Sequence, residues 1–268
     1  MKKLSIIFTM FALSYAVHQE PLFDKNEDID HIVGGKKAKL GSFQFLAVLL
    51  RDGESFCGGS LVTSNCVLTA AHCVDYIKPK DYSSIKLILN TSTINPIDSK
   101  AIERGVKNIV HHKNYNSGTS VNDIALITLD SPVEDIKPIP LPRIGSTLSY
   151  AGMWGTVIGF GRTQKTLADD ESSGNGSNTL MESSLQIITN SQCSAMYAES
   201  KDAKISASML CAYAAGTDTC QGDSGGPLIV DGIQIGIVSW GYGCADPKYA
   251  GVYTRLTFFY SWIRSNLV

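Results

Sequence analysis

The chain has 268 residues, of which 44% are hydrophobic and 18% charged, and its formal net charge is −2. This is the composition of a globular protein with an apolar core, of one large or two small domains, and it excludes a disordered chain or a coiled coil. From residue 32 onward the chain has 20 basic and 20 acidic residues, a balance that argues against a nucleic-acid binder or a binder of anionic membranes.

The first sixteen residues read as a secretory signal peptide. Lys2 and Lys3 form a basic start, the apolar run of residues 4–15 is too short to span a bilayer, and Ser14 and Ala16 give a small-x-small cleavage pattern. The alternative is a buried N-terminal strand or helix. We expect cleavage after Ala16 and a secreted, extracellular protein. No later run has the ~18 apolar residues that a membrane helix needs, so no membrane association is expected.

Residues 17–31 are acidic and aperiodic, as is typical of an exposed propeptide or linker. Beyond them, short apolar runs rich in β-branched residues are bounded by Gly, Pro, Asn and Asp. This pattern predicts an all-β sandwich or barrel. The expected strands are residues 45–50, 85–89, 124–129, 155–160 and 232–240.

Only two segments indicate helix, a short one near residues 191–201 and the C-terminal run of residues 258–268. The polar, Gly- and Ser-rich stretch of residues 168–178 is expected to be a surface loop. Asn90 and Asn175 lie in glycosylation sequons, and both modified and unmodified states remain open.

Seven cysteines occur, and in a secreted protein they predict disulfide bonds. Because seven is odd, at least one cysteine is unpaired or bonded to another chain. The sequence does not choose among the possible pairings. The cysteines are Cys57, Cys66, Cys73, Cys193, Cys211, Cys220 and Cys244.

The stretch DTCQGDSGGP, residues 218–227, places Ser224 among aspartates and glycines. A serine hydroxyl needs a base within hydrogen-bond reach before it acts as a nucleophile. After the signal peptide and propeptide the chain has three histidines. His111 and His112 lie in a polar, turn-rich segment, whereas His72 follows an apolar run, which favours His72 as the base over the usual structural or solvated role of a histidine.

Five short motifs occur in the order in which the chymotrypsin-family serine proteases carry them. The chain resembles that family over residues 32–268, and within it the trypsins, especially those of arthropods such as mites. The resemblance implies a single protease domain of two antiparallel six-stranded β-barrels, divided near residues 140–155, with the site between them and a C-terminal helix. The motifs are IVGG (32–35), LTAAHC (68–73), NDIAL (122–126), GDSGGP (222–227) and SWG (239–241).

The resemblance assigns a catalytic triad. His72 would act as the base, Asp123 would orient and stabilise its imidazole, and Ser224 would be the nucleophile. The backbone N–H groups of Gly222 and Ser224 would form the oxyanion hole. Ser239 resembles the family residue that hydrogen-bonds the triad aspartate and lines the substrate groove.

The same resemblance gives the other two carboxylates near Ser224 separate roles. Asp218 matches the floor of the trypsin specificity pocket, which pairs with substrate Arg or Lys. Thr219 lies beside it, and Gly241 and Gly251 would form the pocket walls. Asp223 matches the activation switch, which pairs with the α-ammonium of Ile32 once the chain is cut before that residue. The alternative for both aspartates is a role in a surface turn.

Family pairing implies the disulfides Cys57–Cys73, Cys193–Cys211 and Cys220–Cys244, with Cys66 left as a buried thiol. Departures from the family pattern occur at Phe160, Ser120 and Ala250. The segment that resembles the calcium loop of trypsins lacks the spaced glutamates that a hard cation needs. No metal and no cofactor are therefore expected.

Together these features predict a secreted zymogen of a trypsin-like serine endopeptidase that cleaves after Arg or Lys. Its expected partners are protein or peptide substrates, protease inhibitors and an activating protease that cuts after His31, and it is expected to act as a monomer. Because acidic residues and a histidine precede Ile32, an enzyme with an acidic pocket is a poor match for that cut. The alternative from another class is a catalytically inactive member of the fold that acts as a binding or decoy protein.

Overall fold

The computed structural model describes residues 34–162 and 176–267. The expected signal peptide, the propeptide, the cut after His31 and the new terminus at Ile32 lie outside the described residues. So do Asn175 and most of the predicted 168–178 loop.

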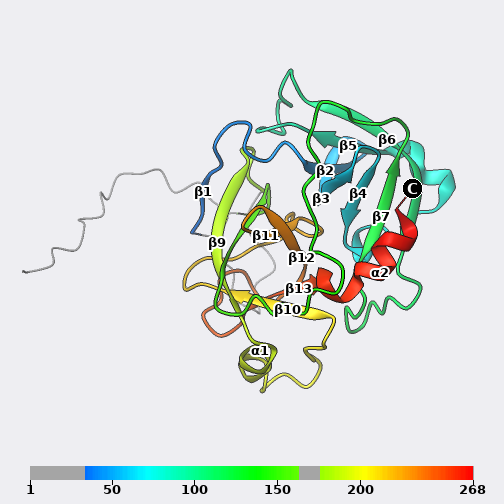
Figure 1. Cartoon of the computed structure of the whole chain (residues 1–268). Coiled ribbons are helices and arrows are strands. Elements are labelled where there is room, and N and C mark those ends of the chain that lie inside the picture. The colour runs from blue at the N-terminus through cyan, green and yellow to red at the C-terminus, as the bar shows by residue number, and fades with distance from the viewer. Residues whose placement is uncertain (1–33, 163–175, 268) are drawn as a thin grey trace, which may run out of the picture.

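The first barrel closes from six antiparallel strands in the order β2-β3-β4-β7-β6-β5 (Figure 1). A short 3₁₀ helix, η1 (Ala71–Cys73), follows β4, and a second one, η2 (Pro79–Ser84), leads into β5. The strands are β2 (Leu46–Arg51), β3 (Glu54–Thr63), β4 (Cys66–Thr69), β5 (Ile85–Leu89), β6 (Ile102–His111) and β7 (Ala125–Leu129).

The second barrel has the order β8-β9-β10-β13-β12-β11 and closes where β8 pairs with both β9 and β11. The short strand β1 (Lys36–Lys37) extends it along β9, and helix α1 (Asn190–Met196) connects β9 to β10. The strands are β8 (Trp154–Gly159), β9 (Met181–Ile188), β10 (Met209–Tyr213), β11 (Pro227–Val230), β12 (Ile233–Trp240) and β13 (Gly251–Arg255).

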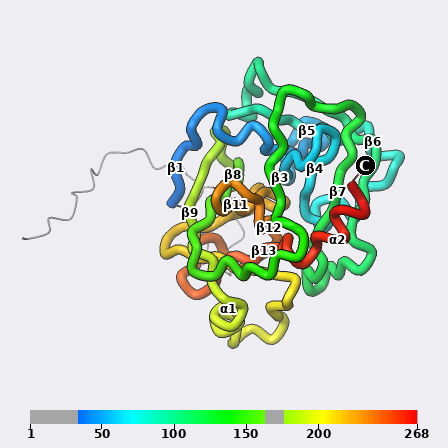
Figure 2. Tube along the Cα trace, viewed as in Figure 1, coloured from blue at the N-terminus to red at the C-terminus, as the bar shows by residue number. Residues whose placement is uncertain are grey.

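Two segments tie the barrels together. Residues 130–153, drawn in green in Figure 2, run from the first barrel to the second. Helix α2 (Leu256–Asn266) follows β13 of the second barrel, but its buried residues Leu256, Phe259 and Ile263 join the core of the first. In Figure 1 this helix, in red, lies beside β7.

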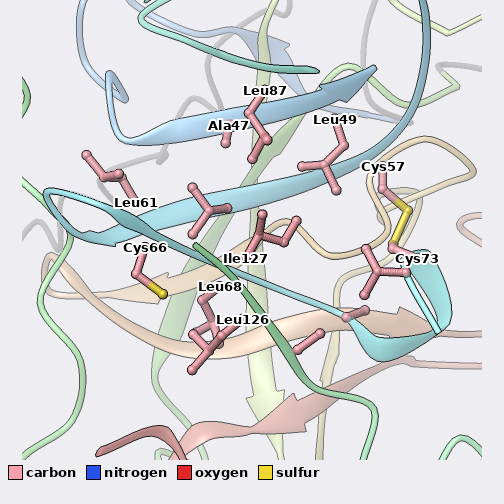
Figure 3. Close-up of a cluster of buried hydrophobic side chains, with 14 of the residues drawn as sticks. Ala47, Leu49, Cys57, Leu61, Cys66, Leu68, Cys73, Leu87, Leu126 and Ile127 are labelled. Carbon is pink, nitrogen blue, oxygen red and sulfur yellow. A yellow bond between two sulfur atoms is a disulfide. The ribbon is translucent and has the colours of Figure 1, made fainter. Parts of the chain in front are cut away.

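Separate apolar cores fill the barrels, and a third cluster lies between them. The first core includes Leu49, Leu68, Ile127 and the free thiol of Cys66 (Figure 3). The third cluster packs Val48 and Ile88 of the first barrel against Ile158 and Phe160 at the end of β8 in the second. The two barrels therefore meet at an apolar interface.

The sequence prediction of an all-β fold of two six-stranded barrels with a C-terminal helix is confirmed. Each of the five predicted strand segments corresponds to a strand, namely β2, β5, β7, β8 and β12. The helix expected near residues 191–201 is shorter, because Tyr197 ends α1 and buries its ring beside Trp240.

Three disulfides join Cys57 to Cys73, Cys193 to Cys211 and Cys220 to Cys244, the pairs that the resemblance implies. Neither α1 nor α2, nor any other helix in the described ranges, has the length and apolar character needed to cross a bilayer.

Candidate active site

The predicted site residues come from both barrels. His72 lies in η1, directly after β4, and Asp123 lies just before β7, so the first barrel supplies both. Ser224 lies in the turn that precedes β11, and Ser239 lies on β12, so the second barrel supplies these. Residues that are far apart in the sequence thus meet where the two barrels face one another.

Asp123 contacts His72 twice, once at the imidazole and once at the backbone. Its Oδ2 lies 2.8 Å from His72 Nδ1, and its Oδ1 accepts a 2.9 Å hydrogen bond from the backbone N–H of His72. Ser239 Oγ donates a 2.6 Å hydrogen bond to the same Oδ2. The Asp123 carboxylate is fully buried, whereas 30% of the His72 side chain is exposed. Asp123 therefore holds Nδ1 and leaves the other ring nitrogen, Nε2, available to other groups.

Opposing effects act on the pKa of His72. Burial of the ring alone lowers the pKa, but the hydrogen bond to Asp123 and the negative charges of Asp123 and Asp75 outweigh burial, so the pKa is raised. A raised pKa makes the imidazole a stronger base. The arrangement suits a group that takes up a proton and holds it next to a buried carboxylate.

Ser224 and His72 both lie next to the Cys57–Cys73 disulfide. The carbonyl oxygen of Ser224 accepts a 2.7 Å hydrogen bond from Gly58 and lies 3.7 Å from Cys73 Sγ, and that sulfur lies 3.6 Å from His72 Nε2. In the described part of the chain, no hydrogen bond joins the Ser224 hydroxyl to His72. Catalytic hydrogen bonds are often long before substrate binds, so the arrangement remains compatible with a base and a nucleophile.

One group of residues meets a distance criterion for metal binding. Ligand atoms of Cys57, His72 and Cys73 lie within 4.8 Å of one another. The two sulfurs are bonded to each other, so neither is the thiolate that a metal requires.

The turn before Ser224 has two backbone N–H groups free for a ligand. Gly222 has φ +101°, a left-handed conformation that favours glycine. Within the described ranges, the N–H groups of Gly222 and Ser224 donate to no other protein group. Ser224 and its turn thus offer two unpaired backbone donors, the kind of group from which an oxyanion hole is built.

Asp223 points away from this turn into the protein. Its Oδ1 accepts a 2.8 Å hydrogen bond from Gly161 N–H, and its Oδ2 accepts a 3.0 Å bond from Cys220 N–H. A side chain at Gly159 or Gly161 would collide with the carboxylate. Burial raises the pKa of Asp223 to about 6, and the two hydrogen bonds offset only part of this effect. No cationic side chain of the described ranges pairs with it.

Asp218 lies at a cavity of about 180 Å³ that opens beside Ser224. Thr219, Ser239, Gly241 and Gly251 also line this cavity. A Cβ atom at Gly251 would come within 2.9 Å of Asp218 Oδ1, so glycine keeps the carboxylate accessible. The Cys220–Cys244 disulfide forms part of the wall.

The Asp218 carboxylate accepts hydrogen bonds from two backbone N–H groups, and the side chain of Thr219 also acts on it. Oδ1 accepts a 2.8 Å hydrogen bond from Thr219 N–H, and Oδ2 accepts a 3.3 Å bond from Ala245 N–H. Burial raises the pKa of Asp218 to about 7, although both hydrogen bonds act in the opposite direction. A buried carboxylate in a cavity without a cation is suited to a cationic ligand.

A second hollow, of about 220 Å³, adjoins the Asp218 cavity through Trp240 and Gly241. One side of it comes from residues 118–120 and the other from residues 202–204. The short Ser120 side chain, noted above as a departure from the family pattern, lies at its edge. This hollow extends the cleft away from Ser224.

The sequence analysis missed Thr254. Its hydroxyl donates a 2.6 Å hydrogen bond to the carbonyl oxygen of Asp123, so β13 of the second barrel holds the backbone of the carboxylate. The signal in the sequence is weak, because Thr254 is one of two hydroxyl residues in the short strand-like run GVYTRL. The contact becomes evident only when the barrels are placed together.

Comparisons with known proteins agree with this geometry. A family model described as Trypsin matches residues 32–263. The chain is 36% identical to "Trypsin epsilon" of Drosophila erecta over 236 residues, which cover 87% of this chain and 86% of that protein. It is 37% identical to "Trypsin alpha" of Drosophila melanogaster over 244 residues, 88% of this chain and 87% of the relative. It is 38% identical to a "Trypsin" of Xenopus laevis over 247 residues, 90% and 92% respectively.

Proposed function

The chain belongs to the trypsin family of serine proteases, and on that premise we propose that it is a secreted endopeptidase, made as a zymogen, that cleaves peptide bonds after Arg or Lys. One observation carries the proposal. The buried carboxylate of Asp123 is bonded to His72 Nδ1, and nearby Ser224 borders a cavity that holds the second buried carboxylate, Asp218.

Chemistry would follow from the His72–Asp123 pair. Ser224 Oγ attacks the carbonyl carbon of the scissile bond while its proton moves to His72 Nε2. Asp123 stabilises the imidazolium, and the N–H groups of Gly222 and Ser224 receive the carbonyl oxygen as it becomes negative. The proton on Nε2 then passes to the leaving amine. Water, deprotonated by His72, attacks the acyl-enzyme and releases the new carboxylic acid.

Specificity would come from Asp218. A substrate guanidinium or ammonium in the cavity replaces the missing cation and restores the ionised carboxylate. A neutral substrate side chain leaves that buried group without a partner. Glycines at 241 and 251 leave room for a long side chain, and Thr219 offers a hydroxyl beside the carboxylate.

Activation would use the other unpaired carboxylate. A cut between His31 and Ile32 creates an α-ammonium that pairs with Asp223 and orders the Gly222 turn. Residues 1–16 are the proposed signal peptide and 17–31 the propeptide. Because Asp28, Asp30 and His31 precede the cut, neither this enzyme nor trypsin is a suitable activator, and we propose a protease of another specificity, such as a cysteine protease.

The proposed partners follow from the cleft. Protein substrates and substrate-like inhibitors would both occupy the Asp218 cavity and the adjoining hollow. Since one chain supplies every proposed catalytic group, we propose that the protein acts as a monomer.

The test uses proenzyme with and without a papain-like protease or trace trypsin, followed by N-terminal sequencing. Only the papain-like enzyme should create an IVGG terminus, and only that product should react with a fluorophosphonate at Ser224. It should hydrolyse Arg and Lys anilides, and Ser224→Ala should not. An IVGG terminus made by trypsin or by proenzyme alone refutes the activation scheme. A correctly cut protein that takes no label is a non-catalytic binding protein.

Asp218→Ser separates specificity from catalysis. The variant should keep its fluorophosphonate reaction but lose about 3–5 kcal/mol of transition-state binding on Arg substrates, because one partner of a desolvated charge pair is gone. A wild-type preference for Phe or Leu, or Arg activity retained by the variant, would exclude Asp218 as the determinant.

A further inference from the structure

The segment that delivers Asp123 is an unusual piece of backbone. Residues 112–124 connect β6 to β7, and Asp123 is their last residue but one. Ser120 and Asn122 both have left-handed conformations, with φ of +52° and +61°. Residues other than glycine and asparagine rarely adopt that backbone conformation. Contacts with neighbouring residues therefore stabilise the backbone of this segment.

Asn122 supplies one of these contacts beside Asp123. Its Nδ2 donates a 2.8 Å hydrogen bond to the carbonyl oxygen of Asn114, which joins the two arms of the segment. Asn116 braces the tip, since its N–H donates to Val121 O at 3.0 Å. Asn116 Oδ1 also accepts from two N–H groups of the tip, at 2.9 and 3.1 Å.

The other end of the segment rests on α2 through His112. Its backbone N–H donates a 3.0 Å hydrogen bond to Ile124 O, and its Nδ1 accepts a 3.2 Å bond from Asn114 N–H. The ring centroid lies 5.6 Å from those of Phe259 and Trp262 on α2. Asn114 thus links His112 to Asn122, and Asn122 is bonded covalently to Asp123.

The state of His112 agrees with this role. Burial and the charges of Lys113 and His111 lower its pKa, so the ring is neutral and Nδ1 is free to accept. Arg264, the one charged residue of α2, lies in the last turn of that helix and is not among the groups that act on the ring.

Asp123 has little tolerance for rotation. Its two oxygens serve His72 Nδ1, His72 N–H and Ser239 Oγ, and its carbonyl serves Thr254. A change in the peptide before it would turn the carboxylate away from the imidazole. We propose that Asn122 is a positioning residue that fixes the aim of Asp123 at His72, with His112 anchoring the same segment on α2.

This inference rests on the proposed triad. The experiment compares Asn122→Gly, which keeps the backbone conformation but loses the amide donor, with Asn122→Ala, which loses both. Ser117→Ala is the matched control, because Ser117 is exposed in the same segment and its side chain makes no hydrogen bond within the described ranges.

For Asn122→Ala, kcat on an Arg anilide should fall by about 10- to 100-fold, as for a small misplacement of a catalytic group, and Asn122→Gly should lose less. KM should not change, because the proposed substrate-binding carboxylate, Asp218, lies outside this segment. The acid limb of the kcat/KM profile should move to lower pH, because a turned Asp123 no longer raises the pKa of His72. Loss of stability alone would not move that limb. His112→Ala should act in the same direction, and His112→Asn, which can still accept from Asn114, should recover part of the loss.

A readout independent of turnover is the low-field proton NMR signal of His72 Nδ1–H in the activated chain. It should weaken or shift upfield in both Asn122 variants and remain in Ser117→Ala. If Asn122→Ala does not fold, Asn122→Gly decides. An Asn122→Gly protein with wild-type kcat, acid limb and NMR signal overturns the positioning role. An inactive wild-type protein counts against the proposed function, and the NMR comparison then still decides the role of Asn122.

Discussion

Three buried aspartates determine the chemistry of the cleft, and they differ in their partners. Asp123 is bonded to His72 and to the hydroxyl of Ser239. Asp218 and Asp223 accept hydrogen bonds from backbone N–H groups, and neither pairs with a cationic side chain of the described ranges. A buried carboxylate without a cation is costly, and we propose that the last two receive cations that arrive from elsewhere. In the proposed function these are a substrate side chain for Asp218 and a new N-terminus for Asp223.

The raised pKa of Asp218 predicts a pH dependence of ligand binding. With a pKa of about 7, the carboxyl loses its charge as the pH falls below neutrality, and a cationic ligand must displace the proton. A small benzamidine-type inhibitor should therefore bind Ser224→Ala protein more weakly as the pH is lowered through about 7. Calorimetry in two buffers of different ionisation enthalpy should detect proton release at neutral pH. Asp218→Ser should lose both effects, and an affinity that is constant across this range would contradict the prediction.

At the scale of single elements, strand β4 brings the imidazole to the cleft. All four of its residues are buried, and it pairs with β3 on one side and β7 on the other. His72 follows shortly after the strand, in η1, so the paired strand restricts the position of its ring. Thr69, the last residue of β4, donates a 2.8 Å hydrogen bond to Gly58 O, next to the Cys57–Cys73 disulfide. An anchored strand end keeps the base at a fixed place.

The same strand carries the unpaired thiol of Cys66, which should be inert in the native protein. Burial raises the pKa of Cys66 to about 12, so almost no thiolate exists at neutral pH. Iodoacetamide followed by peptide mapping should find no label in native buffer and one label, on Cys66, after unfolding without reductant. Labelling of any other cysteine would contradict the three disulfides, and rapid native labelling would contradict the burial of β4.

At the scale of the whole molecule, the site depends on how the two barrels join. Ser60 on β3 donates a 2.6 Å hydrogen bond to Gln234 Oε1 on β12, and both residues are fully buried. Gln234 Nε2 donates in turn to Gly236 O at 3.2 Å. This polar link lies between apolar cores and has a single favourable arrangement, so it fixes one barrel against the other.

Replacing one of these two side chains should destabilise the protein more, per residue changed, than replacing both. Gln234→Leu leaves the Ser60 hydroxyl unpaired, and Ser60→Ala leaves Gln234 Oε1 unpaired, so each should lower the free energy of unfolding by about 1–3 kcal/mol. The double variant should cost less than the sum of the two. Denaturant unfolding of disulfide-intact Ser224→Ala protein measures all three values. Strictly additive costs would show that the two side chains do not interact.

Activation should change how the stability of the whole chain depends on pH. Burial raises the pKa of Asp223 to about 6, above its usual value of 3.8. An acid with a higher pKa in the folded state binds more protons there, so the contribution of Asp223 to stability falls as the pH rises from about 4 to about 6 and is then constant. The α-ammonium of Ile32 would remove this loss, which amounts to about 3 kcal/mol.

The measurement compares proenzyme and cut protein on the Ser224→Ala background. The free energy of unfolding of the cut form should exceed that of the proenzyme by a margin that widens between about pH 4 and about pH 6. Asp218 is present in both forms, so the part of its contribution that does not depend on the charge of Asp223 cancels in the difference. A margin independent of pH would contradict the pairing of Ile32 with Asp223.

The sequence by itself determined the class of the fold, most strand positions and the identity of the site candidates. Short β-branched runs such as residues 85–89 favour strands wherever they occur, because that preference is local. Ser224, His72 and Asp123 were found because the chemistry of a serine nucleophile requires a base and an orienting acid, and because short motifs resemble one family.

Only the tertiary structure decided which groups meet. Thr254 on Asp123, Asn122 on Asn114 and Gln234 on Ser60 join segments whose spacing carries no periodic signal. The difference between Asp123, which pairs with His72, and Asp218 and Asp223, which pair with no cationic side chain in the described part of the chain, likewise depends on burial. Burial is a property of the packed barrels, since solvent is excluded by residues from the whole chain.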